Sequence, residues 1–107
     1  MTKEKRVHDD FQDFVLEQLQ DPKDIALYLK IAAADEDEGV FLIALRNVAL
    51  ARCKSIAALA KEANLNEQNL YRMLSKNGNP RLDSLRAVLR ATGIEIDFHP
   101  IKNYKHN

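Results

Sequence analysis

Several residue types that mark particular protein classes are scarce in this chain of 107 residues. A single cysteine, Cys53, excludes an intramolecular disulfide and favours a reducing compartment, so we expect a cytoplasmic protein. No apolar run approaches the roughly 18 residues that span a bilayer, and the polar N-terminus lacks the apolar stretch of a signal peptide. Three glycines and three prolines are too few for a low-complexity chain. We therefore expect one soluble domain with no membrane contact.

Residues suited to catalysis or metal binding are also scarce. His8, His99 and His106 lie near the two ends, and no spacing places two of them on one helix face. Cys53 has no Cys-x-x-Cys partner and borders an apolar helix, which favours a buried structural thiol. The carboxylates of residues 35–38 lack the glycine and the alternating spacing of a calcium loop. We therefore expect no enzyme activity and no cofactor.

The chain has no net charge, but its charges are unevenly distributed. Residues 1–39 hold five Lys or Arg against eleven Asp or Glu, whereas residues 40–92 hold nine against three. An acidic segment suits a basic protein, and a basic segment suits a polyanion. The alternative is that both are ordinary solvated faces.

Apolar residues recur at three- and four-residue spacing through most of the chain, which predicts amphipathic helices. The expected helices cover residues 11–19, 25–32, 40–52, 55–63, 66–75 and 82–89. Asp21-Pro22 predicts a helix start, because aspartate caps and proline suits the first helical position. Gly93 predicts the end of the last helix. Ile94, Ile96 and Phe98 then alternate with polar residues, which is typical of a strand. The expected fold is all-α, with five to six helices and a short C-terminal β-strand.

Residues 56–74 have the pattern of a helix-turn-helix. Ala60 is small enough for two helices to cross closely, and Asn64 stands in the turn, where a residue must tolerate positive φ. An apolar spine would join both helices to a third, and it consists of Leu59, Ala63, Leu65, Leu70 and Met73. The domain boundaries predicted from this pattern are an acidic helical segment at 1–39, packed on or extending the core, a helix-turn-helix domain at 40–93, and a strand and tail at 94–107.

The second of these two helices leaves a polar face for recognition of double-stranded DNA. Glutamine and asparagine pair with adenine and arginine with guanine, so Gln68, Asn69 and Arg72 are the expected base-reading residues, with Glu67 as a further candidate. The expected phosphate contacts are Tyr71, Lys76 and Arg81, with the backbone of Asn77 and Gly78. The alternative is an ordinary helix pair with a solvated face.

Two further segments have open interpretations. One helix-turn-helix reads few base pairs, so we expect a homodimer, in which Ile94, Ile96 and Phe98 pair across a two-fold axis. The alternative is that this strand docks on the helices of its own chain. The acidic residues 1–39 either form a partner surface or complete the hydrophobic core.

Several motifs together resemble the addiction module antidote proteins, which are HigA-like members of the Cro/C1-type helix-turn-helix group. The resemblance covers residues 14–100 and is carried by Asp21-Pro22, Tyr28-Leu29, Phe41-Leu42-Ile43-Ala44-Leu45, Asn69-Leu70-Tyr71-Arg72-Met73-Leu74-Ser75 and Gly78-Asn79-Pro80. Asn64 departs from the usual turn glycine, and Asn66 stands where serine is common. The resemblance implies an antitoxin that neutralises a RelE-like or HigB-like toxin and represses their shared operon by binding its own promoter. The alternative is a stand-alone regulator or an interaction module without a toxin.

Overall fold

The computed structural model describes residue 17 and residues 19–102, and this part of the chain contains five α-helices and no strand. The helices are α2 (Pro22–Ala33), α3 (Glu38–Cys53), α4 (Ile56–Ala63), α5 (Glu67–Met73) and α6 (Leu82–Ala91). The predicted helical architecture is thus confirmed for these residues. The helix expected at 11–19 lies outside the described residues, apart from 17 and 19. None of the described helices has the length and apolar character needed to cross a membrane.

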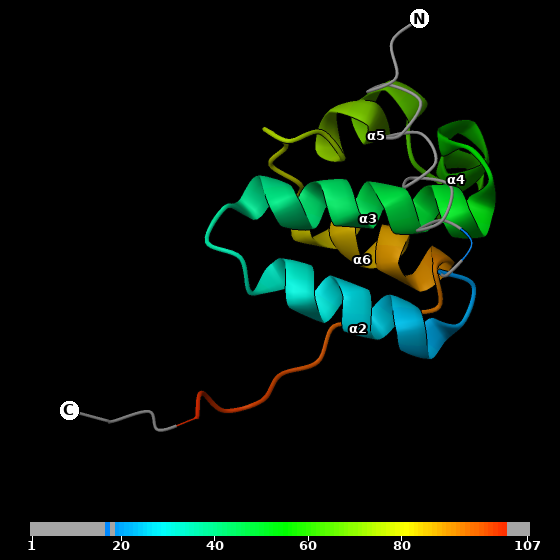
Figure 1. The fold of residues 1–107 in the computed structure, drawn as a ribbon. Coiled ribbons are helices and arrows are strands. Elements are labelled where there is room, and N and C mark those ends of the chain that lie inside the picture. The colour runs from blue at the N-terminus through cyan, green and yellow to red at the C-terminus, as the bar shows by residue number, and fades with distance from the viewer. Residues whose placement is uncertain (1–16, 18, 103–107) are drawn as a thin grey trace, which may run out of the picture.

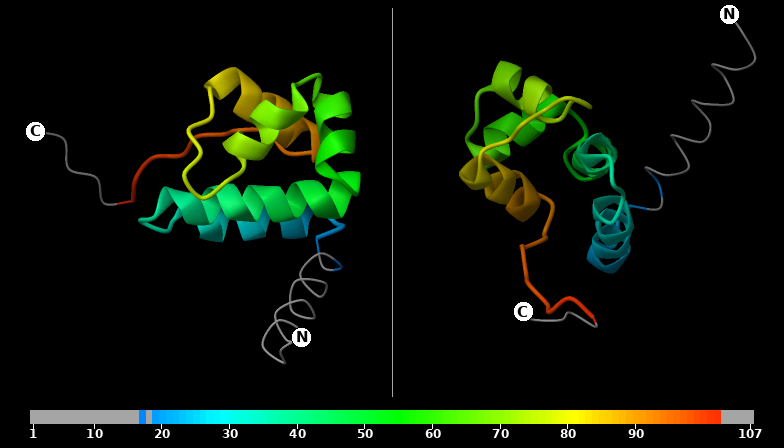
Figure 2. Two further views of the ribbon diagram at one scale, coloured as in Figure 1. Left: turned by 90° about the horizontal axis from the view of Figure 1, so that it is seen from above. Right: turned by 90° about the vertical axis from the view of Figure 1, so that its left-hand side faces the viewer.

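Helix α3 is the centre of the arrangement. Helix α2 runs antiparallel beside it, and α4, α5 and α6 gather on another side (Figure 1). The views in Figure 2 show α2 and α3 as one layer, with the three later helices stacked against it. Helices α2 and α5 therefore lie on different sides of α3.

Short polar residues set the helix starts. The Asp21 carboxylate accepts a hydrogen bond from the Lys23 backbone N–H at 2.9 Å, and Pro22 occupies the first turn, which confirms the predicted start of α2. Asp37 caps α3 by accepting from the Gly39 N–H at 2.8 Å. Asp35, Glu36 and Asp37 thus lie in the loop that joins α2 to α3, Asp37 caps α3, and Glu38 is the first residue of that helix.

The hydrophobic core draws on every described helix. Its largest fully buried apolar side chains are Ile25, Leu45, Val48, Leu59, Leu70, Leu74 and Val88. The acidic N-terminal segment contributes Leu19, Ile25, Leu29 and Ala32. These four residues belong to the core, and within the described part of the segment the exposed residues of α2 lie on its other faces.

The C-terminal tail begins as the sequence predicts and then differs from it. Gly93 takes a φ of +87° after α6, and the Ile94 N–H donates to the Leu89 carbonyl at 2.9 Å, which closes the helix. Residues 94–101 then form no strand, so the predicted strand of Ile94, Ile96 and Phe98 is not confirmed. Ile94 and Ile96 lie half-buried against the core, whereas Phe98 is 84% exposed. A strand needs a second backbone to pair with, and the described part of this chain supplies none.

Candidate nucleic-acid interface

The turn between α4 and α5 is built on two asparagines. Asn64 has a φ of 58° and a ψ of 49°, which confirms the predicted positive φ at this position. The next N–H, of Leu65, donates to the Ala60 carbonyl at 2.8 Å and closes α4. Asn66 then caps α5, since its side-chain oxygen accepts from the Asn69 N–H at 3.0 Å. The chain thus reverses direction within three residues.

Apolar residues hold these two helices in place. Leu59 and Ala60 of α4 and Leu70 and Met73 of α5 are buried, and Leu74 directly after α5 is buried as well. The burial of Ala60 agrees with its predicted place at the helix contact. The orientation of α5 is therefore fixed from its inner side.

The outer side of α5 carries the predicted base-reading residues. Glu67, Gln68, Asn69 and Arg72 are all exposed, and so is Tyr71. Gln68 and Arg72 lie one turn apart on this face, opposite the buried Leu70 and Met73. The arrangement presents amide and guanidinium groups to an approaching ligand.

A cleft beside α5 brings together residues of both predicted classes. It has a volume of about 450 Å³ and lies between α5, the loop 74–81 and the start of α6. Asn69 and Arg72 line it together with Asn77, Gly78 and Arg81. The sequence analysis missed Ser84, which lines the same cleft from the first turn of α6. The indication that the sequence offered for Ser84 is its place two residues after the start of the predicted last helix.

Four of the predicted residues do not line this cleft. Glu67, Gln68 and Tyr71 project from other parts of the exposed face of α5. Lys76 lines a different groove, on the side of α2 and α3. The loop that contains Lys76 therefore borders two separate hollows.

The loop after α5 is held tightly against the end of that helix. The Ser75 hydroxyl donates to the Arg72 carbonyl at 2.7 Å, and the Gly78 N–H donates to the Ser75 carbonyl at 3.0 Å. A Cβ on Gly78 would lie only 2.2 Å from the Met73 carbonyl oxygen, so glycine is required here by close approach. Gly78 thus lets the loop that lines the cleft lie directly against the end of α5.

The charge of the segment that contains α5 and α6 suits a polyanion. Residues 67–92 carry five arginines and lysines against two acidic residues, all exposed. Asp83 pairs with Arg81 at 3.2 Å, and this hydrogen-bonded guanidinium lowers the pKa of the Asp83 carboxyl below its usual value. Arg86 and Arg90 of α6 are exposed as well, but they line a separate hollow with Glu95 and not the cleft beside α5.

Cys53 lies apart from this face, at the end of α3. Its thiol donates to the Glu62 carboxylate at 3.4 Å, and the residue is buried, which confirms the predicted burial. Burial, followed by the contact with Glu62, raises the pKa of the thiol to about 11. The described residues contain no group of three His, Cys, Asp or Glu that could hold a metal ion.

Comparison with known proteins identifies a family whose model matches this chain. A family model described as "Probable addiction module antidote protein" matches residues 10–100. An uncharacterized protein of Haemophilus influenzae is 30% identical over 86 residues, which cover 79% of this chain and 87% of that protein. No solved structure matches the chain at a significant level.

Proposed function

Because this chain belongs to the family of addiction module antidote proteins, we propose that it is the antitoxin of a toxin–antitoxin pair and represses its own operon. In this proposal it is a HigA-like protein of the Cro/C1 helix-turn-helix type, a DNA-binding regulator and not an enzyme. The toxin that it neutralises is RelE-like or HigB-like and is encoded beside it.

One observation carries the DNA-binding part of this proposal. The second helix of a helix-turn-helix, α5, exposes Gln68, Asn69 and Arg72, and two of these residues share a cleft with the loop that leads into α6. Base edges in the major groove would meet the exposed face of α5, while a phosphate would approach Arg81 and the backbone of Asn77 and Gly78. The excess of basic residues over 67–92 supports the same orientation.

The proposal includes a homodimer. Repressors of this type read two half-sites about 34 Å apart, which two copies of α5 would contact. The tail leaves α6 with Phe98 84% exposed and with no backbone partner among the described residues. Pairing of residues 94–98 across a two-fold axis would supply that partner.

A footprint on the promoter region of its own gene tests these points. Wild-type protein should protect two half-sites one helical turn apart. Gln68→Ala and Arg72→Ala should each weaken binding by about 1–3 kcal/mol and relax base preference. Arg81→Ala should weaken binding to all sequences equally and lower the salt dependence, because a phosphate contact releases counterions regardless of sequence.

Two results would contradict the proposal. An unchanged footprint with Gln68→Ala and Arg72→Ala would show that α5 does not read the bases. Repression without neutralisation of the adjacent gene product would indicate a stand-alone regulator. Ala26→Gln, on the exposed side of α2 and outside the helix-turn-helix, is the matched control.

A further inference from the structure

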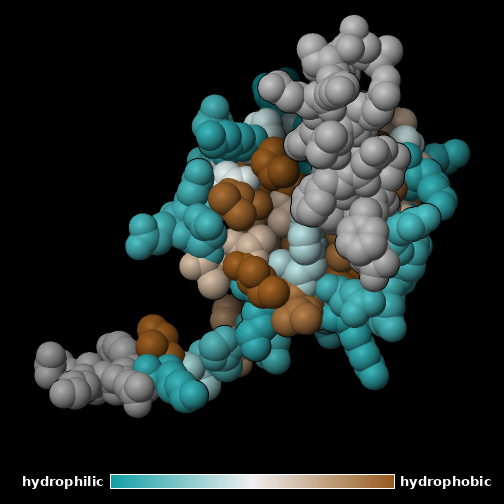
Figure 3. Space-filling view, in the orientation of Figure 1, coloured by the Kyte–Doolittle hydropathy of each residue, from teal (hydrophilic) through white to brown (hydrophobic). Residues whose placement is uncertain are grey.

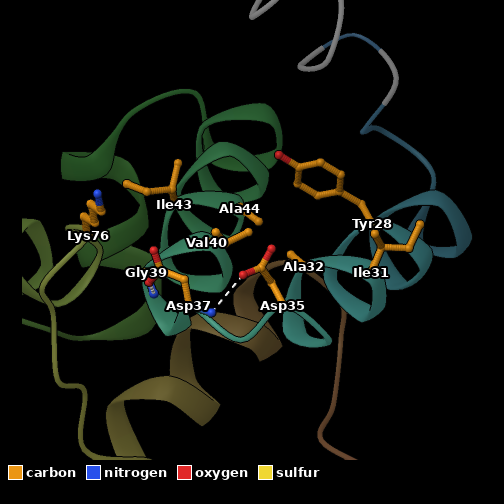
Figure 4. A pocket seen from close by; sticks show the side chains of 10 residues that line it. All are labelled: Tyr28, Ile31, Ala32, Asp35, Asp37, Gly39, Val40, Ile43, Ala44 and Lys76. Carbon is orange, nitrogen blue, oxygen red and sulfur yellow. Dashed lines mark hydrogen bonds between the residues drawn. The ribbon is translucent and has the colours of Figure 1, made fainter.

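An apolar groove lies between α2 and α3 and reaches the loop that follows α5. Tyr28, Ile31 and Ala32 line it from α2, and Val40, Ile43 and Ala44 line it from α3 (Figure 4). Its volume is about 500 Å³. Ile31 is 66% exposed, Val40 40% and Ile43 36%, and Figure 3 shows hydrophobic side chains gathered on this face. Such a patch on a small protein marks an interaction surface.

Carboxylates border the groove at the end where α2 joins α3. Asp35 and Asp37 line it, and Glu36 of the same loop is exposed between them in the sequence. The Asp35 side chain is held inward by a hydrogen bond from the Asp37 N–H at 2.8 Å (Figure 4). On α2, Asp24, Tyr28 and Ile31 follow each other at four- and three-residue spacing, and Asp35 lies just beyond the end of the helix at the same groove. Apolar and acidic residues thus share one stripe.

These carboxylates lack cationic partners within the described residues. The one side-chain ion pair there is Arg81–Asp83, on the other side of the molecule. Lys23 and Lys30 of α2 project about 100° or more around the helix axis from this stripe. Lys76 is the one cation among the residues that line the groove. The rim therefore keeps a negative charge that a ligand can meet.

The charge distinguishes between possible occupants. The C-terminal tail of a second copy carries exposed apolar residues, but Glu95 and Asp97 alternate with them. Its insertion would place these carboxylates near Asp35 and Asp37. A protein that presents an apolar side chain flanked by Lys or Arg would instead gain attraction from the same rim.

We infer that the α2–α3 groove is the surface by which this chain binds its toxin, and that the toxin inserts an apolar side chain flanked by basic residues. This inference rests on the proposed antitoxin function and adds the surface to it. It also places the toxin away from the exposed face of α5, so that the base-reading residues remain free in the complex.

The test uses the protein encoded by the open reading frame adjacent to this chain's gene. That protein is produced together with the full chain, purified and then titrated with the wild-type chain and with its variants. Ile31→Arg puts a positive charge at an exposed position that lines the groove, and we expect at least about a tenfold rise in Kd. Ala26→Arg is the matched control, because it adds the same charge to an exposed position on another face of α2 and should leave Kd within about twofold. Asp35→Asn keeps the hydrogen-bond acceptor but removes the charge, so it should slow association and flatten its salt dependence.

Circular dichroism and a promoter band shift, both unchanged by Ile31→Arg, would show that the fold and the DNA-binding face are intact. Toxin binding by Ile31→Arg equal to that of wild type would overturn the groove assignment and leave the antitoxin function standing. Self-association of the wild type that Ile31→Arg abolishes would also overturn the assignment, because a second copy would then be the occupant. If the wild type neither binds nor neutralises the adjacent product, the proposed function is wrong, and the inference fails with it.

Discussion

Replacement of Gly78 by alanine tests how the cleft beside α5 is built. The added Cβ would lie 2.2 Å from the Met73 carbonyl oxygen and 2.9 Å from that of Arg72. Both neighbours are backbone atoms, so the loop has to move outward by about 1 Å to reach an ordinary contact distance. Overpacking of this kind costs about 1–3 kcal/mol. The movement would carry Asn77 and Arg81 away from Asn69 and Arg72.

Gly93→Ala provides a matched control. Its φ of +87° strains an alanine, at a cost of about 1 kcal/mol, but its Cβ would meet no atom within 4 Å. The two variants are therefore destabilised on a similar scale for different reasons. Only Gly78→Ala should alter the cleft.

Thermal unfolding and a promoter band shift separate these effects. In a domain of this size, 1 kcal/mol corresponds to about 4–8 °C in Tm, so both variants should melt measurably earlier than wild type. Well below both melting temperatures, Gly78→Ala should bind the promoter about tenfold more weakly, the equivalent of about 1.4 kcal/mol. Gly93→Ala should bind as wild type does. Equal promoter affinity of all three proteins would refute the view that the loop after α5 positions DNA-binding groups.

Two further predictions concern charged and titratable groups. Asp83→Asn should strengthen promoter binding several-fold in a band shift, because Arg81 loses its ion-pair partner and the DNA-facing side loses a negative charge; unchanged affinity would place Arg81 away from the phosphates. The raised pKa of Cys53, about 11, means that the folded state holds this proton more tightly than the unfolded state does. The free energy of unfolding should consequently fall between pH 9 and 11, more steeply in wild type than in Cys53→Ala. Urea unfolding at several pH values measures this fall. An equal dependence of the free energy of unfolding on pH in both proteins would show that the thiol does not contribute.

The helix ends were predictable because each depends on one local interaction. Asp21 and Pro22 start α2, Asn64 takes the positive φ that the turn requires, and Gly93 closes α6. In each case the residue type has a backbone preference that the neighbouring sequence cannot easily override. The exposed face of α5 followed from the same local periodicity.

The tail and the loop after α5 depend on contacts that sequence spacing does not contain. The alternation of Ile94, Ile96 and Phe98 fits a strand, but it also fits an irregular segment that rests Ile94 and Ile96 on the core. Lys76 follows α5 closely, yet it lines the α2–α3 groove, because the loop turns there. The clustering of Ser84 with Arg72 likewise depends on where α6 packs.

The loop after α5 gives the two proposed surfaces a common boundary. Lys76 lines the groove between α2 and α3, whereas its neighbours Ser75 and Asn77 line the cleft beside α5. A ligand that displaces this loop from either side changes the free energy of binding on the other. Thermodynamic linkage makes that coupling reciprocal, so the factor by which a protein in the groove alters the affinity for DNA equals the factor by which DNA alters the affinity for that protein. A movement of the stretch 75–77 is therefore enough to couple binding at one surface to binding at the other.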